Sequence, residues 1–294
     1  MATLLSIMCS PKVGGFTEAL LRETLHGVRE ISGVNIDEIF LPDYQFQTCR
    51  ACYSCTRSPK HTCVLDDEMG KNGDGELFLK LNSANGLLLA NPTYLWGANA
   101  LCHLFFERCY PFIWSDTLNG MPFASVSSAY NIGFHRLADR EICRWAFLIK
   151  FRHIGSLPTH SVHFEKSKPQ LRQLGKDIAE ATLRDAREGR KKFTDEERFL
   201  YYMDKPWTAL EPYFDNLTFG TFQWENSLTQ LGFAEGWFSD PDAIKDFEVA
   251  DAELKAAFKH YEEGNLSEAN RILAKASVTW KRATGKEYHS RRNK

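Results

Sequence analysis

Four of the eight cysteines in the sequence lie within fifteen residues, at a spacing that can bind a metal. Cys49, Cys52, Cys55 and Cys63 form the pattern C-x2-C-x2-C-x7-C. The short gaps let a turning backbone direct successive sulfurs at neighbouring irons, and the longer gap reaches a fourth corner. Compact ferredoxin runs have a similar shape, although there the fourth cysteine ligates a different cluster. The pattern therefore favours an iron–sulfur cluster.

Zinc is the main alternative, because all-cysteine zinc sites also use C-x2-C pairs. Such sites usually contain two pairs separated by a longer loop, whereas here three cysteines follow one another at three-residue steps. Four unligated thiols are the remaining alternative, which their clustering disfavours. The cysteines outside this run that lie on or beside predicted helices, Cys102, Cys109 and Cys143, are expected to be small buried hydrophobic residues.

A second candidate site follows the apolar run from Thr3 to Met8. The segment 9–18 contains Ser10, two glycines and Thr17, and it leads into a helical pattern. Backbone N–H groups at the start of a helix, together with hydroxyls, can bind a phosphate group. The segment is neither a Walker loop nor G-x-G-x-x-G. Ser10 or Thr17 could instead simply cap the helix.

Two further loops follow later apolar strands. In the segment 91–99, Pro92 and Gly97 bracket a turn that carries Tyr94 and Trp96, whose flat rings suit a planar heterocycle. In the segment 127–131, small residues allow a close backbone approach, and Tyr130 adds another ring. The alternative is that these aromatic residues only cover the end of a sheet.

The elements that would position these loops alternate along the first half of the chain. The strand-like segments are Thr3–Met8, Val34–Phe40, Gly86–Asn91, Pro122–Ser127 and Leu157–His163, and the helical patterns are Phe16–Ile31, Asn99–Arg108, Phe134–Arg152 and Lys168–Arg190. Five strands alternating with helices predict a doubly wound parallel sheet. In such sheets ligands bind beyond the carboxyl ends of the strands.

The pattern changes after Arg190. The segment 191–240 is aromatic and interrupted by prolines, and 251–283 predicts two helices separated at Gly264-Asn265, followed by a solvated tail from Trp280. We therefore predict a first domain over 1–190 and a mainly helical C-terminal extension over 191–294. The net charge of −2 disfavours a nucleic-acid partner.

The expected location is the cytoplasm. No apolar run reaches the 18 or more residues of a membrane span, so no membrane partner is expected. The apolar start lacks the basic n-region of a secretory signal. In that compartment cysteines stay reduced, which suits metal or redox chemistry better than disulfides.

Together these motifs resemble the flavodoxin-like NADPH-dependent FMN reductases, and within them the iron–sulfur flavoproteins. The segment 10–17, S-P-K-V-G-G-F-T, is similar to the family's G-S-P-R-x-x-G-N-T, and 91–94, N-P-T-Y, is similar to S-P-V-Y. The cysteine run is followed by Asp-Asp-Glu-Met at 66–69, like the family's Asp-Asp-x-Met. Cys9, Lys12 and Phe16 stand where the family usually has Gly, Arg and Asn. The resemblance covers about residues 1–190.

The resemblance implies a flavodoxin-like, doubly wound, five-stranded parallel sheet that binds FMN, with a cysteine-rich cluster insert at about 47–75. The implied FMN-binding residues are Ser10, Lys12, Gly15, Phe16, Thr17, Pro92, Thr93, Tyr94, Leu95, Trp96, Gly97, Ser127, Ser128 and Tyr130. The implied ligands of a [4Fe–4S] cluster are Cys49, Cys52, Cys55 and Cys63. No general acid or base is expected, because the flavin carries the chemistry.

The implied function is that of a flavin-dependent oxidoreductase in electron transfer. A cluster moves one electron and a flavin one or two, so the pair can link a ferredoxin-like donor to a small-molecule two-electron acceptor. NAD(P)H is the other candidate reductant, and the resemblance implies a homodimer or homotetramer. Two alternatives remain: a cluster-free NAD(P)H-dependent FMN or quinone reductase, and a redox-sensing binding protein that acts through its helical tail.

Overall fold

The computed structural model of the protein describes residues 2–292. The chain divides into two compact units, residues 1–192 and 193–294. The boundary lies two residues after the one that the sequence predicts.

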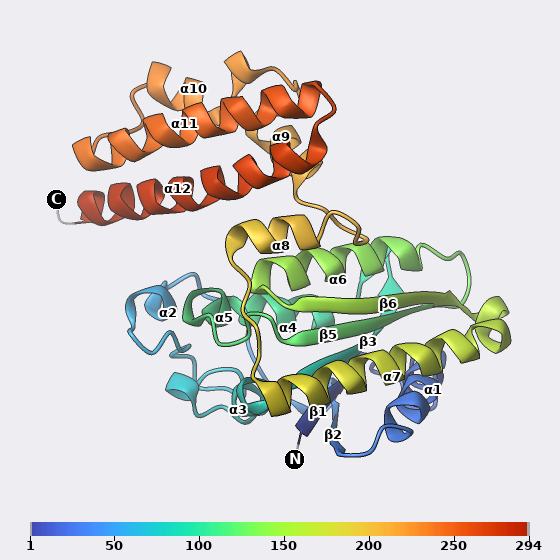
Figure 1. Ribbon diagram of the computed structural model, residues 1–294. Coiled ribbons are helices and arrows are strands. Elements are labelled where there is room, and N and C mark those ends of the chain that lie inside the picture. The colour runs from blue at the N-terminus through green and yellow to red at the C-terminus, as the bar shows by residue number, and fades with distance from the viewer. Residues whose placement is uncertain (1, 293–294) are drawn as a thin grey trace. The chain divides into compact units, whose positions relative to one another are not determined.

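The N-terminal unit is built on a parallel sheet (Figure 1). Within residues 2–192, its five parallel strands are β1 (Ala2–Met8), β2 (Val34–Phe40), β3 (Gly86–Tyr94), β5 (Pro122–Ala129) and β6 (Arg152–His160). Their order across the sheet is β2-β1-β3-β5-β6, the flavodoxin-like doubly wound order. The two-residue β4 (Gly97–Ala98) pairs antiparallel with the end of β3. The predicted fold class is confirmed.

Helices cover both faces of this sheet (Figure 1). One face carries α1 (Phe16–Arg29) and α7 (Phe164–Glu188), whose buried leucines pack on β1 and β3. The other face carries α3 (Glu76–Ser83), α4 (Ala100–Arg108), α5 (Tyr110–Ser115) and α6 (His135–Ile149). Short helical turns are η1 (Leu41–Asp43), α2 (Ser54–Arg57), η2 (Lys71–Gly73) and η3 (Ser161–His163).

Several predicted boundaries in this unit are wrong, among them the end of the helix predicted to reach Arg152, which lies at Ile149. Strand β6 begins at Arg152, five residues before the predicted start, and α7 begins at Phe164, four residues before its predicted start. The polar start of β6 hides it from a search for apolar runs. The Arg152 guanidinium donates to both carboxylate oxygens of Asp185 on α7, each at 2.9 Å. This pairing lets a charged, largely buried residue open the edge strand β6.

Two glycines allow α1 and α7 to cross with their backbones in contact. A Cβ atom on Gly27 would lie 1.9 Å from the carbonyl oxygen of Arg172, and one on Gly175 would lie 2.0 Å from the carbonyl oxygen of Thr24. Both distances are far below any real contact. A side chain at either position must therefore push the helices apart.

A buried carboxyl group joins α6 to the sheet. Asp139 is 3% exposed and accepts hydrogen bonds from the hydroxyls of Ser156 at 2.9 Å and Ser125 at 3.5 Å. Burial raises the pKa of Asp139 to about 6, and the hydrogen bonds from Ser156 and Ser125 offset only part of that effect. The folded protein therefore keeps this carboxyl group protonated to a higher pH than the unfolded chain does.

The C-terminal unit is helical, as predicted. Its elements are α8 (Asp195–Tyr201), α9 (Leu210–Leu217), η4 (Trp224–Asn226), α10 (Leu228–Ala234), α11 (Pro241–Glu262) and α12 (Leu266–Arg292). The last two form the predicted hairpin, but α12 continues to Arg292, so the prediction of a tail from Trp280 is wrong. The Trp280 ring packs on Phe247 of α11, with ring centroids 5.0 Å apart.

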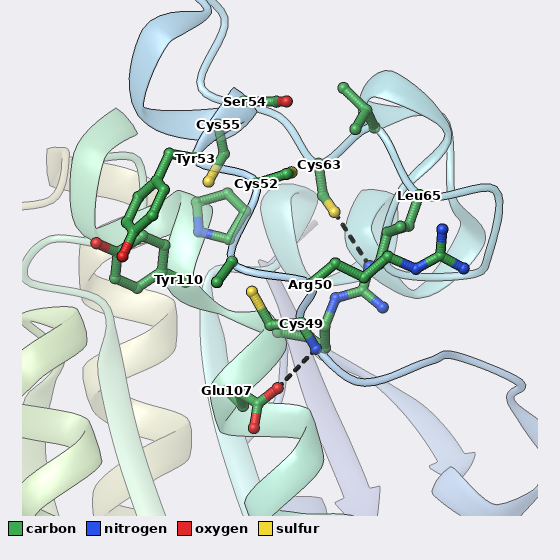
Figure 2. A pocket seen from close by; sticks show the side chains of 14 residues that line it. Cys49, Arg50, Cys52, Tyr53, Ser54, Cys55, Cys63, Leu65, Glu107 and Tyr110 are labelled. Atoms are coloured by element: carbon green, nitrogen blue, oxygen red, sulfur yellow. Dashed lines mark hydrogen bonds between the residues drawn. The ribbon is translucent and has the colours of Figure 1, made fainter. Parts of the chain in front are cut away.

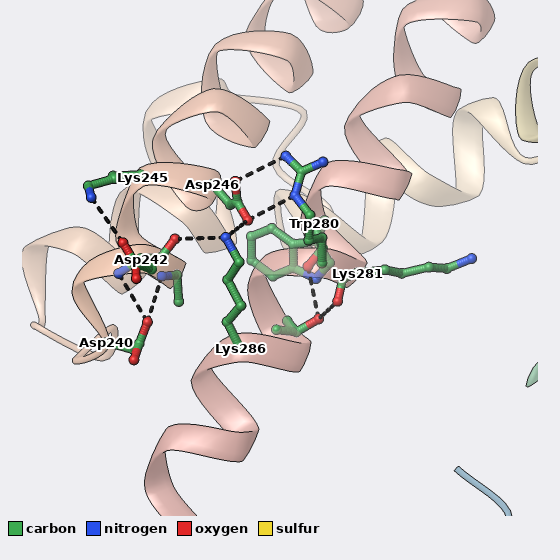
Figure 3. Close-up of polar contacts among 10 residues, drawn as sticks. Asp240, Asp242, Lys245, Asp246, Trp280, Lys281 and Lys286 are labelled. Atoms are coloured by element: carbon green, nitrogen blue, oxygen red, sulfur yellow. Dashed lines mark hydrogen bonds and ion pairs between the residues drawn. The ribbon is translucent and has the colours of Figure 1, made fainter. Parts of the chain in front are cut away.

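Polar contacts fix the open end of this hairpin (Figure 3). The Asp240 carboxylate caps α11 by accepting from the backbone N–H groups of Asp242 at 3.0 Å and Ala243 at 2.8 Å. Asp246 accepts from Arg282 of α12 at 2.9 and 3.0 Å.

Among the described helices, none has the length and apolar character needed to cross a membrane.

We expect Gly175→Ala to lower the free energy of unfolding by about 1–3 kcal/mol, because the added methyl group overlaps the backbone of α1. Gly285→Ala on α12 is the matched control, since nothing lies within 4 Å of its added Cβ. That change should raise the free energy of unfolding by about 0.5–1 kcal/mol. Urea unfolding measures both, and equal stabilities of Gly175→Ala and wild type would contradict the crossing.

We expect Asp139→Asn to become progressively less harmful to stability as pH rises from 4 to 7. Because burial raises the pKa of Asp139 in the folded state, the carboxyl group loses its proton at a lower pH in the unfolded chain. The stability that the protonated group contributes to the fold is therefore lost as the pH rises towards about 6. The difference between an ordinary pKa of about 4 and the folded pKa of about 6 corresponds to about 3 kcal/mol. Urea unfolding of wild type and variant at both pH values tests this; a stability difference independent of pH would refute it.

Candidate functional site

The predicted flavin residues gather at the carboxyl-end edge of three adjacent strands. In the sheet, β1 lies beside β3 and β3 lies beside β5. The register pairs Met8 with Ala90 and Asn91 with Ser127, so the loops after these strands begin side by side. The structure thus brings the segments 10–17, 92–97 and 127–130 to one edge.

The first loop leaves the start of α1 without a side-chain cap. Gly15 is the N-cap residue, and within the described chain no side chain accepts a cap hydrogen bond there. The Ser10 hydroxyl accepts from the backbone N–H of Lys12 at 3.2 Å, and the Thr17 hydroxyl lies 2.7 Å from that of Ser128 on β5. Neither hydroxyl is therefore a simple helix cap. The amides of the first turn face the loop, as an anion site requires.

Phe16 contributes only its backbone to this loop. Its ring packs edge-on against Phe164 of α7, with centroids 5.4 Å apart at 87°. The Lys12 side chain is exposed, and the Glu18 carboxylate accepts from the backbone N–H of Gly14 at 2.7 Å. The residue that replaces the family's asparagine therefore packs in the hydrophobic layer instead of offering a side-chain donor.

The second loop is a tight hairpin turn with an unusual sequence. Tyr94 pairs with Gly97, and the two residues between them, Leu95 and Trp96, have φ of 47° and 69°. Positive φ at both central positions is typical of type I′ turns, which strongly prefer Asn-Gly. Leu and Trp there cost on the order of 1–3 kcal/mol each. Such strain persists only where surrounding contacts hold the loop, and it commonly marks a binding site.

Two contacts hold this hairpin, one with Glu141 of α6 and one with Phe134, the N-cap residue of α6. The Glu141 carboxylate accepts from the backbone N–H of Ala98 at 2.9 Å. The Trp96 ring stacks on Phe134, with centroids 4.5 Å apart at 19°. Phe134, itself at φ 61°, is a site residue that the sequence analysis missed. An aromatic residue directly before a helix carries no distinctive signal in the sequence.

Several buried polar atoms at this edge have no partner among the described residues. They are Asn91 Nδ2, Thr93 Oγ1 and Ser127 Oγ. The strand ends thus offer unpaired polar groups beside the exposed rings of Tyr94 and Tyr130. Buried polar groups normally have a partner, so this edge fits a ligand that is polar on one side and aromatic on the other.

The four clustered cysteines line one cavity of about 240 Å³ (Figure 2). The cavity lies between the cysteine run and the start of α5, where Tyr110 and Pro111 complete its wall. The loop contains residues with left-handed backbone conformations, among them Ala51 (φ 50°) and Tyr53 (φ 56°). This strained segment brings together four sulfurs that an extended chain would spread apart.

The sulfurs influence one another electrostatically. Burial raises the pKa of Cys55 to about 11, with further contributions from the thiolates of Cys63, Cys49 and Cys52. Hydrogen bonding to Ser54 lowers the pKa of Cys52. Among the described residues, no three His, Cys, Asp or Glu side chains converge closely enough to hold a metal ion. The cavity is therefore defined by its four cysteine side chains and not by a preformed set of metal ligands.

Consecutive residues at the end of α4 hold both ends of the cysteine run. Glu107 accepts from the backbone N–H of Cys49 at 2.6 Å (Figure 2). Arg108 Nη2 lies 3.3 Å from Cys63 Sγ. Arg108 also forms a two-pronged ion pair with Asp67, at 2.6 and 2.9 Å. Burial would raise the pKa of Asp67, but the hydrogen bonds from Arg108 and the Gln47 backbone outweigh it, so the pKa is lowered.

The family model described as "NADPH-dependent FMN reductase" matches residues 2–156. The chain belongs to this family. The match runs from β1 to the middle of β6, so it includes all three loops and the cysteine run. Membership in the FMN reductase family agrees with the predicted class of flavin-dependent oxidoreductase and supports FMN as the cofactor.

Two curated relatives are both named iron–sulfur flavoproteins. The protein from Methanocaldococcus jannaschii is 29% identical over 108 residues, which are 37% of this chain and 52% of the relative. The protein from Methanosarcina thermophila is 28% identical over 135 residues, which are 45% of this chain and 63% of the relative. The chain thus spans between half and two thirds of the length of these relatives.

Solved structures of oxidoreductases are also similar to this chain. A flavone reductase matches with 17% identity and a TM-score of 0.48, covering 65% of this chain and 66% of that one. An NADH:FMN oxidoreductase matches with 17% identity and a TM-score of 0.44, covering 62% and 89%.

We expect Thr17→Val to weaken FMN binding about tenfold or more. Valine keeps the shape of threonine but loses the hydroxyl beside the first loop, and a hydrogen bond to a charged group contributes about 1.5–3 kcal/mol. Thr24→Val on the same helix is the control, since the Thr24 hydroxyl bonds to the carbonyl of Leu20 inside α1. Titrating flavin-free protein with FMN and following flavin fluorescence gives both Kd values. Equal Kd values for the two variants would show that Thr17 has no part in binding.

Proposed function

We propose that this protein is an electron-transfer oxidoreductase that carries FMN and a [4Fe–4S] cluster. Electrons would pass between a one-electron donor of the ferredoxin type and a small two-electron acceptor. The observation that carries this proposal is the single cavity lined by Cys49, Cys52, Cys55 and Cys63 in a chain of the FMN reductase family.

The donor set supports a cluster. Four thiols around one cavity supply the ligands that [4Fe–4S] groups use. All-cysteine zinc sites usually contain two pairs separated by a longer loop, whereas Cys49, Cys52 and Cys55 follow one another at three-residue steps. Both relatives are named iron–sulfur flavoproteins.

The three loops at the sheet edge support the flavin site. We propose residues 1–190 as the FMN-binding domain, with the insert at about 47–75 as its cluster-binding part. The amides of the first turn of α1, together with Ser10 and Thr17, would hold the phosphate, and Tyr94, Trp96 and Tyr130 would flank the ring. FMN supplies the one- and two-electron chemistry when bound, while the chain binds and orients it.

The charge of the cysteine run suits an acidic electron donor. Between Cys49 and Cys63 the chain carries Arg50, Arg57, Lys60 and no carboxylate, although the whole protein has a net charge of −2. All three cations are exposed. Charge complementarity of this kind steers a negatively charged partner to the surface above the cavity.

The alternative is a cluster-free, NAD(P)H-dependent FMN or quinone reductase. The family description favours a nicotinamide reductant, so NAD(P)H stays a candidate donor in either case. In this alternative the cavity would hold zinc or no metal.

We expect protein purified without oxygen to contain about one FMN, four irons and four acid-labile sulfides per chain. Cys49→Ser should lose most of the iron and keep its FMN, because it removes one thiolate ligand and leaves the sheet edge intact. Cys143→Ser, on α6, should keep both cofactors. Flavin, iron, sulfide and zinc analysis of the three proteins measures this.

The measured content of flavin, iron, sulfide and zinc distinguishes the two candidate functions. FMN with zinc, or FMN without metal, would refute the cluster and leave the simple reductase. Iron that survives Cys49→Ser unchanged would refute the proposed ligand set. Protein without flavin or iron would refute both candidates.

A further inference from the structure

The Arg108 side chain is built into the wall of the cysteine cavity. It is 2% exposed, and its two terminal nitrogens make four hydrogen bonds. Nη1 donates to the Gln47 carbonyl at 2.7 Å and to Asp67 at 2.6 Å, while Nη2 donates to Asp67 at 2.9 Å and to Cys63 Sγ at 3.3 Å. A buried guanidinium thus points a charged N–H group at one of the four sulfurs.

This arrangement is more than a structural ion pair. Asp67 is itself fixed by the backbone N–H groups of Gln47 at 3.0 Å and Met69 at 3.1 Å. A guanidinium stays protonated at any pH in a protein, so its donor to Cys63 is always present. Partners that donate to ligand atoms orient those ligands and tune the group that they bind.

We propose that Arg108 is the positioning residue of Cys63 and that the Arg108–Asp67 pair sets the reduction potential of the cluster. This inference rests on the proposed function. A reduced cluster carries one more negative charge, shared with its sulfur ligands, so an N–H donor to sulfur stabilises the reduced form. Hydrogen bonds to the sulfurs and the net charge nearby are the established determinants of such potentials.

The pair carries no net charge, so its two members should act in opposite directions. Arg108→Gln removes the cation and the donor to Cys63, and the midpoint potential should become more negative. Asp67→Asn leaves a guanidinium that cannot lose its proton, and the potential should become more positive. A merely structural role would not produce shifts of opposite sign.

The experiment is an anaerobic redox titration of the intact, cofactor-loaded protein, with the reduced cluster followed by electron paramagnetic resonance. Iron release to a chelator from Arg108→Gln should be about 10-fold faster or more. Bound FMN and near-ultraviolet circular dichroism report whether the fold is retained. Lys60→Gln is the charge control, because this exposed cation is screened by water and should change the potential much less.

The outcomes are separable. Shifts of opposite sign in the two variants support the inference, and if Arg108→Gln alone loses its iron, a positive shift in Asp67→Asn supports it. Potentials equal to wild type, shifts of the same sign, or loss of iron from both variants with FMN retained would overturn it and leave the proposed function standing. Wild-type protein without a cluster would overturn both.

Discussion

The cysteine segment depends on one buried ion pair. Arg108 and Asp67 are almost completely removed from water, and removing one partner of such a pair typically costs about 3–5 kcal/mol because the other charge is left unpaired. The pair ties the segment after the last cysteine to the end of α4. The cysteine loop has little apolar area of its own to bury and includes left-handed backbone, so this polar anchor fixes its path where a hydrophobic core cannot.

The other end of the same helix contacts the sheet edge where the loops after β1 and β3 begin. The Asn99 side chain caps α4 by accepting from the backbone N–H of Cys102 at 2.9 Å, and it donates to the carbonyl of Cys9 at 2.8 Å. Its backbone N–H donates to Asn91 at 3.1 Å. A nine-residue helix rises about 14 Å, so one short rigid element sets the relation between the loops after β1 and β3 and the cysteine cavity.

Both candidate sites hold backbone strain, and in both the strain is stabilised from outside the loop. Leu95 and Trp96 occupy positions that favour Asn and Gly, and Glu141 and Phe134 hold that hairpin in place. The side chains that supply this support come from other elements, so the loops are preorganised before any ligand arrives. Preorganisation of this kind reduces the entropy cost of binding a cofactor.

The sequence by itself indicated the five parallel strands, the main helices between them and the flavin-dependent class of chemistry. Buried parallel strands are continuous apolar runs, and cysteine spacing and the Gly-containing loop are local patterns, so both can be read along the chain. The tertiary structure alone decided which side chains meet. It paired Thr17 with Ser128, 111 residues away, and Arg108 with Asp67, 41 residues away. It also revealed β4, whose Leu-Trp turn carries no Asn-Gly signal, and the start of β6, whose charge is neutralised only by a distant helix. Such contacts depend on strand register and helix placement, which no local pattern encodes.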